Sequence, residues 1–266
     1  NTVRKLNWKL DQLPYPAYEK FELPKYIHYI DKRLPIETSR GCPYSCTYCD
    51  VKVSMGQAFR PRSPEHILSE IKHWYDKGFR FFEFVDDVFT MDLNRAKKVC
   101  QMIIDSEMKF DWNCANGIRA DRVDEELLIL MKNAGCVFVS YGLETGNPDI
   151  LKVIKKAITL EKAMETFHLT KKVGLKFAVN FIIGHSEETY EKAMDTINFA
   201  KKCPADYVMF SNMIPYPGTE VYQWIRTHEK TGNARFLRQP EEYLKDTTTK
   251  IGLPVYETRE FRYHER

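Results

Sequence analysis

Residues 34–51 of the chain read LPIETSRGCPYSCTYCDV. The first six residues form an apolar run of strand length, and three cysteines follow in the spacing Cys42-x-x-x-Cys46-x-x-Cys49. This strand and its polar loop are the first unit of a repeating pattern, because apolar runs of strand length alternate along the chain with amphipathic stretches of helical period. The unit and its repeats therefore predict the fold.

Five further runs of strand length follow the first. They are FRFFEFV near residue 82, FDWNCAN near 113, CVFVSYG near 139, LKFAVNFII near 179 and ADYVMFSN near 208. Repeats of strand and helix with nearly continuous apolar strands are typical of an α/β fold, in which helices cover a parallel sheet. The sheet either stays open or curls into a barrel, and in both cases the ligand site lies at the carboxyl ends of the strands.

Four amphipathic stretches predict the covering helices. The first begins at Ser63, an N-cap candidate followed by Pro64 at the first helical position, and it ends at Gly78. Its apolar residues fall on one helical face. The other three helices are expected over 124–135, over 160–174 and from residue 187 onward.

Polar residues and glycines follow the strands where the ligand site is expected. They are 42–49 after the first strand, Asp86 and Asp87 after the second, Arg119 after the third, Glu144 after the fourth and 184–187 after the fifth. Because the carboxyl ends of parallel strands meet at one edge of the sheet, we expect these residues to cluster there.

Three cysteines at this spacing favour an iron–sulfur cluster, since thiolates are the ligands that such clusters prefer. A [4Fe–4S] cluster has four irons, so three cysteines leave one iron open to a substrate or cosubstrate. A zinc site and three unrelated buried thiols are the alternatives. No fourth zinc ligand is evident, because the other cysteines fall within predicted helices or strands and are expected to be core or wall residues: Cys100, Cys114, Cys136 and Cys203.

The composition suits a cytoplasmic protein. The 266 residues, 43% of them hydrophobic, suffice for one large α/β domain or two small ones. The formal net charge of +3 is too mild to mark a nucleic-acid binder. No apolar run approaches the roughly 20 residues that span a bilayer, and the N-terminus does not resemble a signal peptide. Three of the seven cysteines lie within eight residues, which suits a metal site in a reducing compartment.

Three segments are expected along the chain. Residues 1–33, rich in proline and aromatic residues, are predicted to form an extended lead-in or linker. Residues 34–230 are expected to form the core domain, and the polar residues 231–266 an irregular strap or tail. The chain starts at Asn1 and not at a methionine, so we expect that it was either processed or cut from a longer protein with a further segment upstream.

The cysteine motif, with Tyr48 directly before the last cysteine and six strand–helix repeats, resembles the radical S-adenosylmethionine (radical SAM) superfamily. The resemblance covers about residues 34–222 and implies a partial (β/α)6 barrel, similar to a TIM barrel, with parallel strands. It implies that Cys42, Cys46 and Cys49 bind a [4Fe–4S] cluster whose open iron chelates S-adenosylmethionine (SAM). Such enzymes cleave SAM reductively to methionine and a 5′-deoxyadenosyl radical, which abstracts hydrogen from a substrate.

The resemblance also assigns residues to the SAM site. Tyr48 is a cofactor-binding candidate beside the cysteines. Asp86 and Asp87 stand where the family usually has Gly-Gly-Glu, a motif that helps to hold the methionine amine. Ser140 and Glu144 stand where the family contacts ribose hydroxyls or the amino-acid moiety, and a carboxylate can accept two hydrogen bonds from a diol.

A segment after the fifth strand resembles a further motif of the family. NFIIGHSEET matches the pattern G-x-I-x-G-x-x-E at Ile182, Gly184 and Glu187, with Asn180 in place of the first glycine. A strand-to-helix turn whose acid complements the helix dipole is the alternative, and both interpretations can hold together. Val208, on the sixth strand, is a candidate to pack against adenine. The alternative is that Val208 is an ordinary residue of the hydrophobic core.

Charged residues near these motifs have further expected roles. Arg119 is the candidate partner of the methionine carboxylate, because a guanidinium binds a carboxylate in a forked manner, and a solvated surface arginine is the alternative. His185 either reaches a substrate or is a surface histidine. Four residues after the cysteines are expected to shape the mouth of the site: Asp50, Lys52, Arg60 and Arg62.

LDQLPYPAYEKFEL, SYGLETGNPDILKVIKK and IPYPGTEVY resemble radical SAM proteins that carry a cobalamin-binding domain upstream. The chain has no D-x-H-x-x-G segment, so a cobalamin would be bound by a domain absent from this chain. The resemblance implies methyl transfer to an unactivated carbon, or ring or oxidation chemistry, and an electron donor such as flavodoxin or ferredoxin. The alternatives are methylthiolation of transfer RNA and a non-catalytic iron–sulfur or metal-binding scaffold. Joint retention of the cysteines, Glu144 and the Gly184 turn favours an enzyme.

Overall fold

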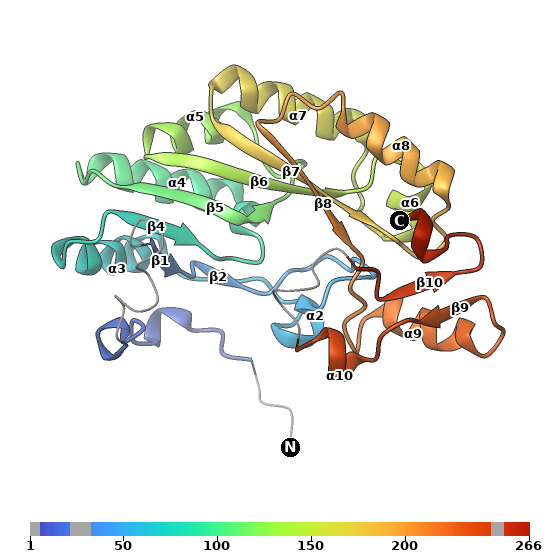
Figure 1. The fold of residues 1–266 in the computed structure, drawn as a ribbon. Helices are drawn as coiled ribbons and strands as arrows, with labels where there is room; N and C mark the ends of the chain where they lie inside the picture. Colours follow the sequence, from blue (N-terminus) through green and yellow to red (C-terminus); the bar gives the residue numbers. More distant parts are fainter. Residues whose placement is uncertain (1–5, 22–32, 246–252) are drawn as a thin grey trace.

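The structure is a computed structural model that describes residues 6–21, 33–245 and 253–266. The predicted lead-in therefore lies only partly within the described residues. Its residues 6–21 contain two short 3-10 turns, η1 (Leu10–Gln12) and η2 (Tyr18–Lys20). Figure 1 shows a twisted sheet with long helices along one face and the C-terminal elements at one end.

Six parallel strands form the main sheet in the order β1-β4-β5-β6-β7-β8. Their bounds are β1 (Arg33–Ile36), β4 (Phe81–Phe84), β5 (Asp111–Ile118), β6 (Cys136–Glu144), β7 (Lys176–Ile183) and β8 (Tyr207–Asn212). Every neighbouring pair is parallel. The six predicted strands and the α/β fold with a partial barrel are thereby confirmed.

Long helices lie along the outer face of this sheet (Figure 1). They are α3 (Pro64–Asp76), α4 (Leu93–Asp105), α5 (Glu125–Asn133), α7 (Leu160–Val173) and α8 (Tyr190–Ala200). The helix α4 was not among the predicted ones, although Asp92 caps it by accepting a hydrogen bond from the backbone N–H of Arg95. The helix α8 begins three residues later than predicted, because residues up to its N-cap Thr189 form a turn.

Several short elements complete the barrel domain. The pair β2 (Ser39–Arg40) and β3 (Arg60–Pro61) is antiparallel and brackets the cysteine loop in the sequence. The helix α2 (Val51–Ser54) follows the last cysteine, the 3-10 turn η3 (Phe89–Met91) follows β4, and α6 (Pro148–Val153) follows β6. The loop that carries the cysteines is therefore held at both ends.

Alternation along the strands divides the side chains between the two faces of the sheet. Phe82, Val139 and Phe177 point to the helices and are fully buried. Complete burial of such side chains stabilises the fold by about 1.5–3 kcal/mol each. The intervening positions point to the opposite, concave face, where Ser140 and Asn180 are hydrogen-bonded to each other. The hydrophobic core thus lies between the outer face of the sheet and the helices that cover it, and the concave face is polar in part.

The C-terminal part has its own small core. It contains α9 (Glu220–Glu229), β9 (Ala234–Phe236), α10 (Pro240–Tyr243), β10 (Tyr256–Thr258) and the 3-10 turn η4 (Tyr263–Glu265). The strands β9 and β10 pair antiparallel, and Val221, Ile225 and Tyr256 are buried in a second hydrophobic cluster. The expectation of an irregular segment is therefore wrong where β9, α10, β10 and η4 form, and β9 packs against α9. The boundaries of the three expected segments stay a prediction.

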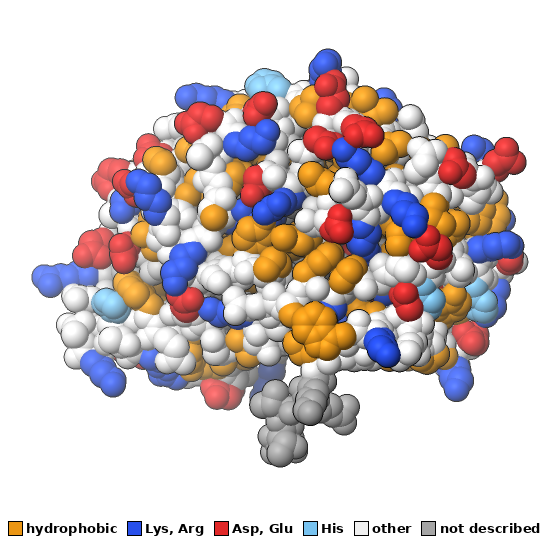
Figure 2. All heavy atoms as spheres, turned by 180° about the vertical axis from the view of Figure 1, so that it is seen from behind, with side chains coloured by type: hydrophobic (Ala, Val, Ile, Leu, Met, Phe, Trp, Pro, Cys, Tyr) orange, Lys and Arg blue, Asp and Glu red, His pale blue; other side chains and the backbone are white. Residues whose placement is uncertain are grey.

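The surface carries charges of both signs. Figure 2 shows basic and acidic side chains interspersed over one face of the molecule, with hydrophobic side chains gathered near its middle. On this face the described residues form no large area of a single charge, in agreement with the small net charge. No helix in the described part of the chain is long and apolar enough to cross a membrane.

Candidate functional site

A cavity of about 320 Å³ lies at the carboxyl ends of the strands. Predicted site residues from four separate segments are among those that line it: Cys42, Cys46, Tyr48 and Cys49 from the first loop, Asp86 and Asp87 after β4, Arg119 after β5, and Glu144 at the end of β6. The expected clustering is thus observed for these side chains, whereas residues 184–187, which were expected to join them, do not line the cavity. Their convergence is a consequence of parallel strands, which bring their carboxyl ends to one edge.

The cysteine loop has a backbone shape that requires glycine at its start. Gly41 has φ +83°, and a Cβ at this position would lie 2.4 Å from the carbonyl oxygen of Ala58. The backbone N–H of Gly41 donates to Oδ2 of Asp87 at 2.7 Å, and that of Cys42 donates to the carbonyl of Gly56 at 3.3 Å. These hydrogen bonds hold the start of the loop to the segment that follows β4 and to the segment that precedes β3.

All three thiols are free and face the same cavity. Cys46 is buried, whereas Cys42 and Cys49 are half-buried. Burial raises the pKa of Cys42 and raises that of Cys49 to about 11, so the positive charge of bound iron is what would keep them as thiolates. Among the described residues no three His, Cys, Asp or Glu side chains converge on a point that could hold a single metal ion. A cubane cluster takes each thiolate on a separate iron, and this donor set fits that group.

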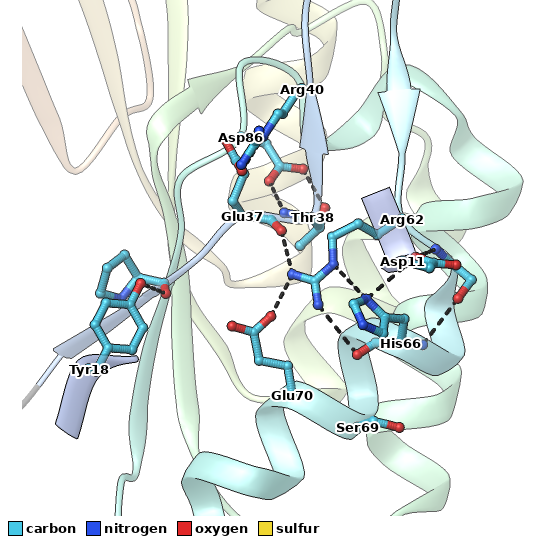
Figure 3. A network of polar contacts seen from close by, with 12 residues as sticks. Asp11, Tyr18, Glu37, Thr38, Arg40, Arg62, His66, Ser69, Glu70 and Asp86 are labelled. Carbon is cyan, nitrogen blue, oxygen red and sulfur yellow. Dashed lines mark hydrogen bonds and ion pairs between the residues drawn. The ribbon is translucent and has the colours of Figure 1, made fainter. Parts of the chain in front are cut away.

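Asp86 and Asp87 fasten the loop to the sheet. Asp86 is buried, and its carboxylate accepts hydrogen bonds from both the backbone N–H and the hydroxyl of Thr38 (Figure 3). It also accepts one from the hydroxyl of Ser39 at 2.7 Å. Burial is the largest influence on its pKa and raises it. Both carboxylates also line the cavity. Their contact with a methionine amine, which the family resemblance implies, stays a prediction.

Arg119 is buried and already bound to a carboxylate of the chain. Its Nε and Nη2 donate to the two oxygens of Asp121 at 2.9 and 3.1 Å, and Nη2 also donates to the carbonyl of Lys156 at 2.7 Å. The guanidinium carbon lies 3.7 Å from the centre of the Tyr44 ring. The alternative of a solvated surface arginine is wrong. Asp121 occupies the face formed by Nε and Nη2, and the predicted contact of Arg119 with a ligand carboxylate stays a prediction.

Glu144 belongs to a buried polar cluster whose cation was not predicted. Its Oε1 lies 2.9 Å from Nζ of Lys156, and the same ammonium lies 3.1 Å from the hydroxyl of Tyr48. Lys156 also lines the cavity. In the sequence it reads as one of two adjacent lysines, and only its burial distinguishes it from the exposed Lys155.

Ser140 and Ile182 lie on the concave strand face near this cluster. The hydroxyl of Ser140 accepts a hydrogen bond from Nδ2 of Asn180 at 2.7 Å, so Asn180, at the position of the family's first glycine, bridges β6 and β7. Ile182 is half-buried on β7. Neither Ser140 nor Ile182 lines the cavity itself.

The turn after β7 differs from its predicted form. The backbone N–H groups of Gly184 and His185 donate to Oε2 of Glu188 at 2.5 and 3.1 Å. Glu188 is fully buried and burial raises its pKa to about 7, whereas the predicted Glu187 is exposed. Sequence matching selected the acid at the motif position, but the neighbouring acid makes the hydrogen bonds.

His185 is fully buried, so the surface alternative is wrong. Its Nε2 lies 3.3 Å from the carbonyl oxygen of Glu144, and burial lowers its pKa to about 4. The side chain therefore ties the turn after β7 to the end of β6. It does not line the cavity, and its predicted reach to a substrate stays untested.

Other predicted residues lie away from the cavity. Val208 is partly exposed and pairs in register with Val179, a fully buried residue of the outer face, so its side chain points away from the concave face. Arg62 forms an ion pair with Glu70 of α3 at 2.5 Å (Figure 3). The expected set at the mouth is thus wrong for Arg62 and also for Arg60, which is buried and binds the carbonyl of Met55 at 2.7 Å.

The remaining mouth candidates lie at the edge of the loop. Asp50 accepts the backbone N–H of Val53 through its carbonyl, and Lys52 forms an ion pair with Glu220 of α9 at 2.9 Å. Of the four other cysteines, three are buried as expected and one is half-buried: Cys100, Cys114, Cys136 and Cys203.

The sequence profile of the radical SAM superfamily matches residues 36–200. An uncharacterized methyltransferase of Pyrococcus horikoshii is 34% identical over 223 residues, which are 83% of this chain and 48% of that protein. The cytidylyl-2-hydroxyethylphosphonate methyltransferase of Streptomyces wedmorensis is 28% identical over 262 residues, or 92% and 47% of the two chains. The chain therefore spans about half the length of the curated relatives it matches.

A solved structure has the same fold. TsrM, a radical SAM methyltransferase from Kitasatospora setae with cobalamin and a [4Fe–4S] cluster bound, superposes with a TM-score of 0.70. The two chains are 20% identical, and the match covers 79% of this chain and 41% of TsrM. At this identity the likeness concerns the fold.

Proposed function

The chain belongs to the radical SAM superfamily, and on that premise we propose that it is the catalytic core of a radical SAM enzyme. Cys42, Cys46 and Cys49 would hold a [4Fe–4S] cluster. Bound there, the cluster would supply the electron that cleaves SAM to methionine and a 5′-deoxyadenosyl radical, which abstracts hydrogen from the substrate. The single observation that carries the proposal is that three free thiols and a buried Glu144 face one cavity at the carboxyl ends of the strands.

The chain's own residues would prepare this site in two ways. Asp86 and Asp87 hold the cysteine loop in place through Thr38 and Gly41, so that the three thiols stay at one cavity before any iron is bound. Glu144 is a carboxylate at the cavity wall, and such a group can accept hydrogen bonds from a ribose diol or an amine. Both roles are preorganisation, because the side chains need little movement to meet a ligand.

We further propose methyl transfer with the participation of cobalamin as the overall reaction. Two relatives are described as methyltransferases, and TsrM was solved with cobalamin bound. In the present case the cobalamin would be bound by a domain outside these 266 residues, and the electron would come from a donor such as flavodoxin or ferredoxin. A cytoplasmic location, free of oxygen, is part of the same proposal.

Reductive cleavage of SAM tests the proposal. The chain is purified without oxygen, reconstituted with iron and sulfide, and reduced in the presence of SAM, and 5′-deoxyadenosine is measured by chromatography. We expect product from the wild type, none from Cys46→Ala, and an undiminished amount from the matched control Cys203→Ala, whose thiol lies outside the cavity lining. Equal product from Cys46→Ala and the wild type would contradict the assignment of the cluster ligands.

A further inference from the structure

We propose that Tyr256 and Arg266, in the C-terminal segment, are positioning residues of the cavity. They hold the turn after β7, and His185 of that turn holds two residues of the cavity wall. The inference rests on the proposed function, because its effect is measured on the handling of SAM. It goes beyond that function by giving the C-terminal segment a part in the site.

His185 joins the turn to two residues that line the cavity, Tyr48 and Glu144. Its Nε2 lies 3.3 Å from the carbonyl oxygen of Glu144, and its ring meets the ring of Tyr48 edge-on, with 6.0 Å between the two centres. Since a carbonyl only accepts hydrogen bonds, Nε2 is the donor and carries the proton. A displacement of His185 would therefore move two parts of the wall at once.

The backbone of Glu144 needs such a restraint. Glu144 has φ +79°, a conformation that is costly for a residue with a side chain. The pairing of β6 with β7 is irregular between Gly142 and Glu144, so the sheet alone does not fix this end of β6. A strained backbone persists only where the surrounding contacts hold it. The hydrogen bond from His185 to the carbonyl of Glu144 is one of these contacts.

Tyr256 and Arg266 both contact Gly184, the residue at the start of the turn. The hydroxyl of Tyr256 donates to the carbonyl of Gly184, and a Cβ at this glycine would lie 2.6 Å from Nη1 of Arg266. Gly184 also has φ +96°, so the close approach and the backbone conformation both require glycine. Arg266 is itself fixed, because Nη1 and Nη2 donate to the carbonyls of Tyr256 at 2.8 Å and of Phe261 at 3.2 Å.

The junction contains polar groups that a purely structural contact would not need. Among the described residues, three buried atoms of the junction have no hydrogen-bond partner within the protein: Nδ1 of His185, Oε1 of Glu188 and Nε of Arg266. An unpaired buried group is unfavourable, whereas apolar side chains of similar volume often hold two segments together at lower cost. Hydrogen bonds fix direction as well as distance, and apolar contacts do not. The junction therefore serves to place the turn.

The same part of the chain also holds the cysteine loop. The backbone N–H of Val221 donates to the carbonyl of Thr47 at 3.0 Å, and Glu220 forms an ion pair with Lys52 at 2.9 Å. Tyr48 packs against the second hydrophobic cluster, which the C-terminal elements form. These elements therefore join the cysteine loop to the turn after β7.

The kinetics of reductive SAM cleavage test the inference. The reconstituted chain is reduced at increasing concentrations of SAM, and the rate of 5′-deoxyadenosine formation gives KM and kcat. The wild type is compared with Arg266→Met, Tyr256→Phe and His185→Phe. The matched control is Arg262→Met in the same segment, since Arg262 is 45% exposed and pairs with Glu257 at 3.3 Å. Iron content and thermal midpoint are recorded for each protein, so that only loaded, folded chains are compared.

We expect each of the three variants to raise KM for SAM about 3- to 10-fold, the range for one lost hydrogen bond, at unchanged iron content. Iron content should not change, because Asp86 and Asp87 hold the cysteine loop independently of the turn. Arg262→Met should keep the wild-type KM. A lower thermal midpoint with an unchanged KM in the three variants is the result of a merely structural tie, and it would overturn the inference.

The double variant Arg266→Met with His185→Phe tests whether Arg266 acts through His185. Residues that act through one another are not additive, so we expect the double variant to have the KM of His185→Phe alone. Two effects on KM that multiply would overturn the inference. Tyr256→Phe removes a single oxygen and covers the case that Arg266→Met does not fold, since a wild-type KM in a fully loaded Tyr256→Phe is equally contrary. A wild type that binds no iron and cleaves no SAM would instead overturn the proposed function.

Discussion

Replacement of Glu70 by glutamine tests the buried ion pair between Glu70 and Arg62. Glu70 of α3 is 1% exposed, and its Oε2 lies 2.5 Å from Nη1 of Arg62, which also donates to the carbonyl of Glu37 at 2.7 Å (Figure 3). Glutamine keeps the volume but leaves the guanidinium without a counter-charge. Breaking a buried pair in this way costs about 3–5 kcal/mol, a large share of the roughly 5–15 kcal/mol that stabilises a typical domain.

The assay is urea unfolding of the chain without cluster, followed by circular dichroism. Burial raises the pKa of Glu70, so the measurement is made at pH 8, well above the usual range of a carboxyl group. The matched control is Glu65→Gln on the same helix. Glu65 pairs with Lys98 at 2.6 Å, but both side chains are more than half exposed, and such a pair contributes about 1 kcal/mol at most.

The double variant Arg62→Met with Glu70→Met gives the second arm. Apolar side chains of similar volume restore much of the stability of a buried pair, because neither charge is then left alone. We therefore expect the double variant to be more stable than Glu70→Gln. The reasoning is refuted if Glu70→Gln unfolds at the same urea concentration as Glu65→Gln, or if the double variant is the least stable of the set.

Three further predictions concern the site. Gly41→Ala should abolish iron loading in reconstitution, since its Cβ would lie 2.4 Å from the carbonyl of Ala58; normal loading would contradict the loop geometry. Gly142→Ala should lower 5′-deoxyadenosine formation about tenfold or more at unchanged iron content, because its Cβ displaces Glu144, and full activity would refute this. Glu188→Gln should remove a pH dependence of unfolding. The raised pKa of Glu188 means that the native state binds the proton more tightly than the unfolded state does. The stability that the protonated Glu188 contributes is therefore lost as pH rises from about 4.5 to about 7, by about 3 kcal/mol at most. A difference in unfolding free energy between variant and wild type that stays constant across that range would be contrary evidence.

The strands could be predicted because their apolar runs are buried on the helix side of a parallel sheet. Phe82 and Phe177 are fully buried where the sequence places a strand, and Ser63 caps α3 by accepting the N–H of His66. The helix α4 was missed although its cap, Asp92, is of a usual type. Its sequence lacks the Gly or Pro boundaries that marked the predicted helices.

The site could be predicted less completely, because burial and not residue type separates neighbouring candidates. Lys156 and Lys155 are adjacent, yet one borders the cavity and the other is half exposed in an ion pair with Glu220. Glu188 and Glu187 are likewise adjacent, and the buried one lies outside the matched motif position. Side-chain direction after a turn depends on backbone angles such as the positive φ of Glu187, which a linear pattern does not encode.

The central claim is that three cysteines hold a cluster with one iron open toward this cavity. Its most direct test is the electron paramagnetic resonance spectrum of the reduced, reconstituted chain before and after addition of SAM, with iron counted per chain. We predict about four irons per chain and a signal whose g values shift when SAM is added, as expected for a ligand on the open iron. Zinc in place of iron, or a cluster signal that SAM leaves unchanged, would contradict the account.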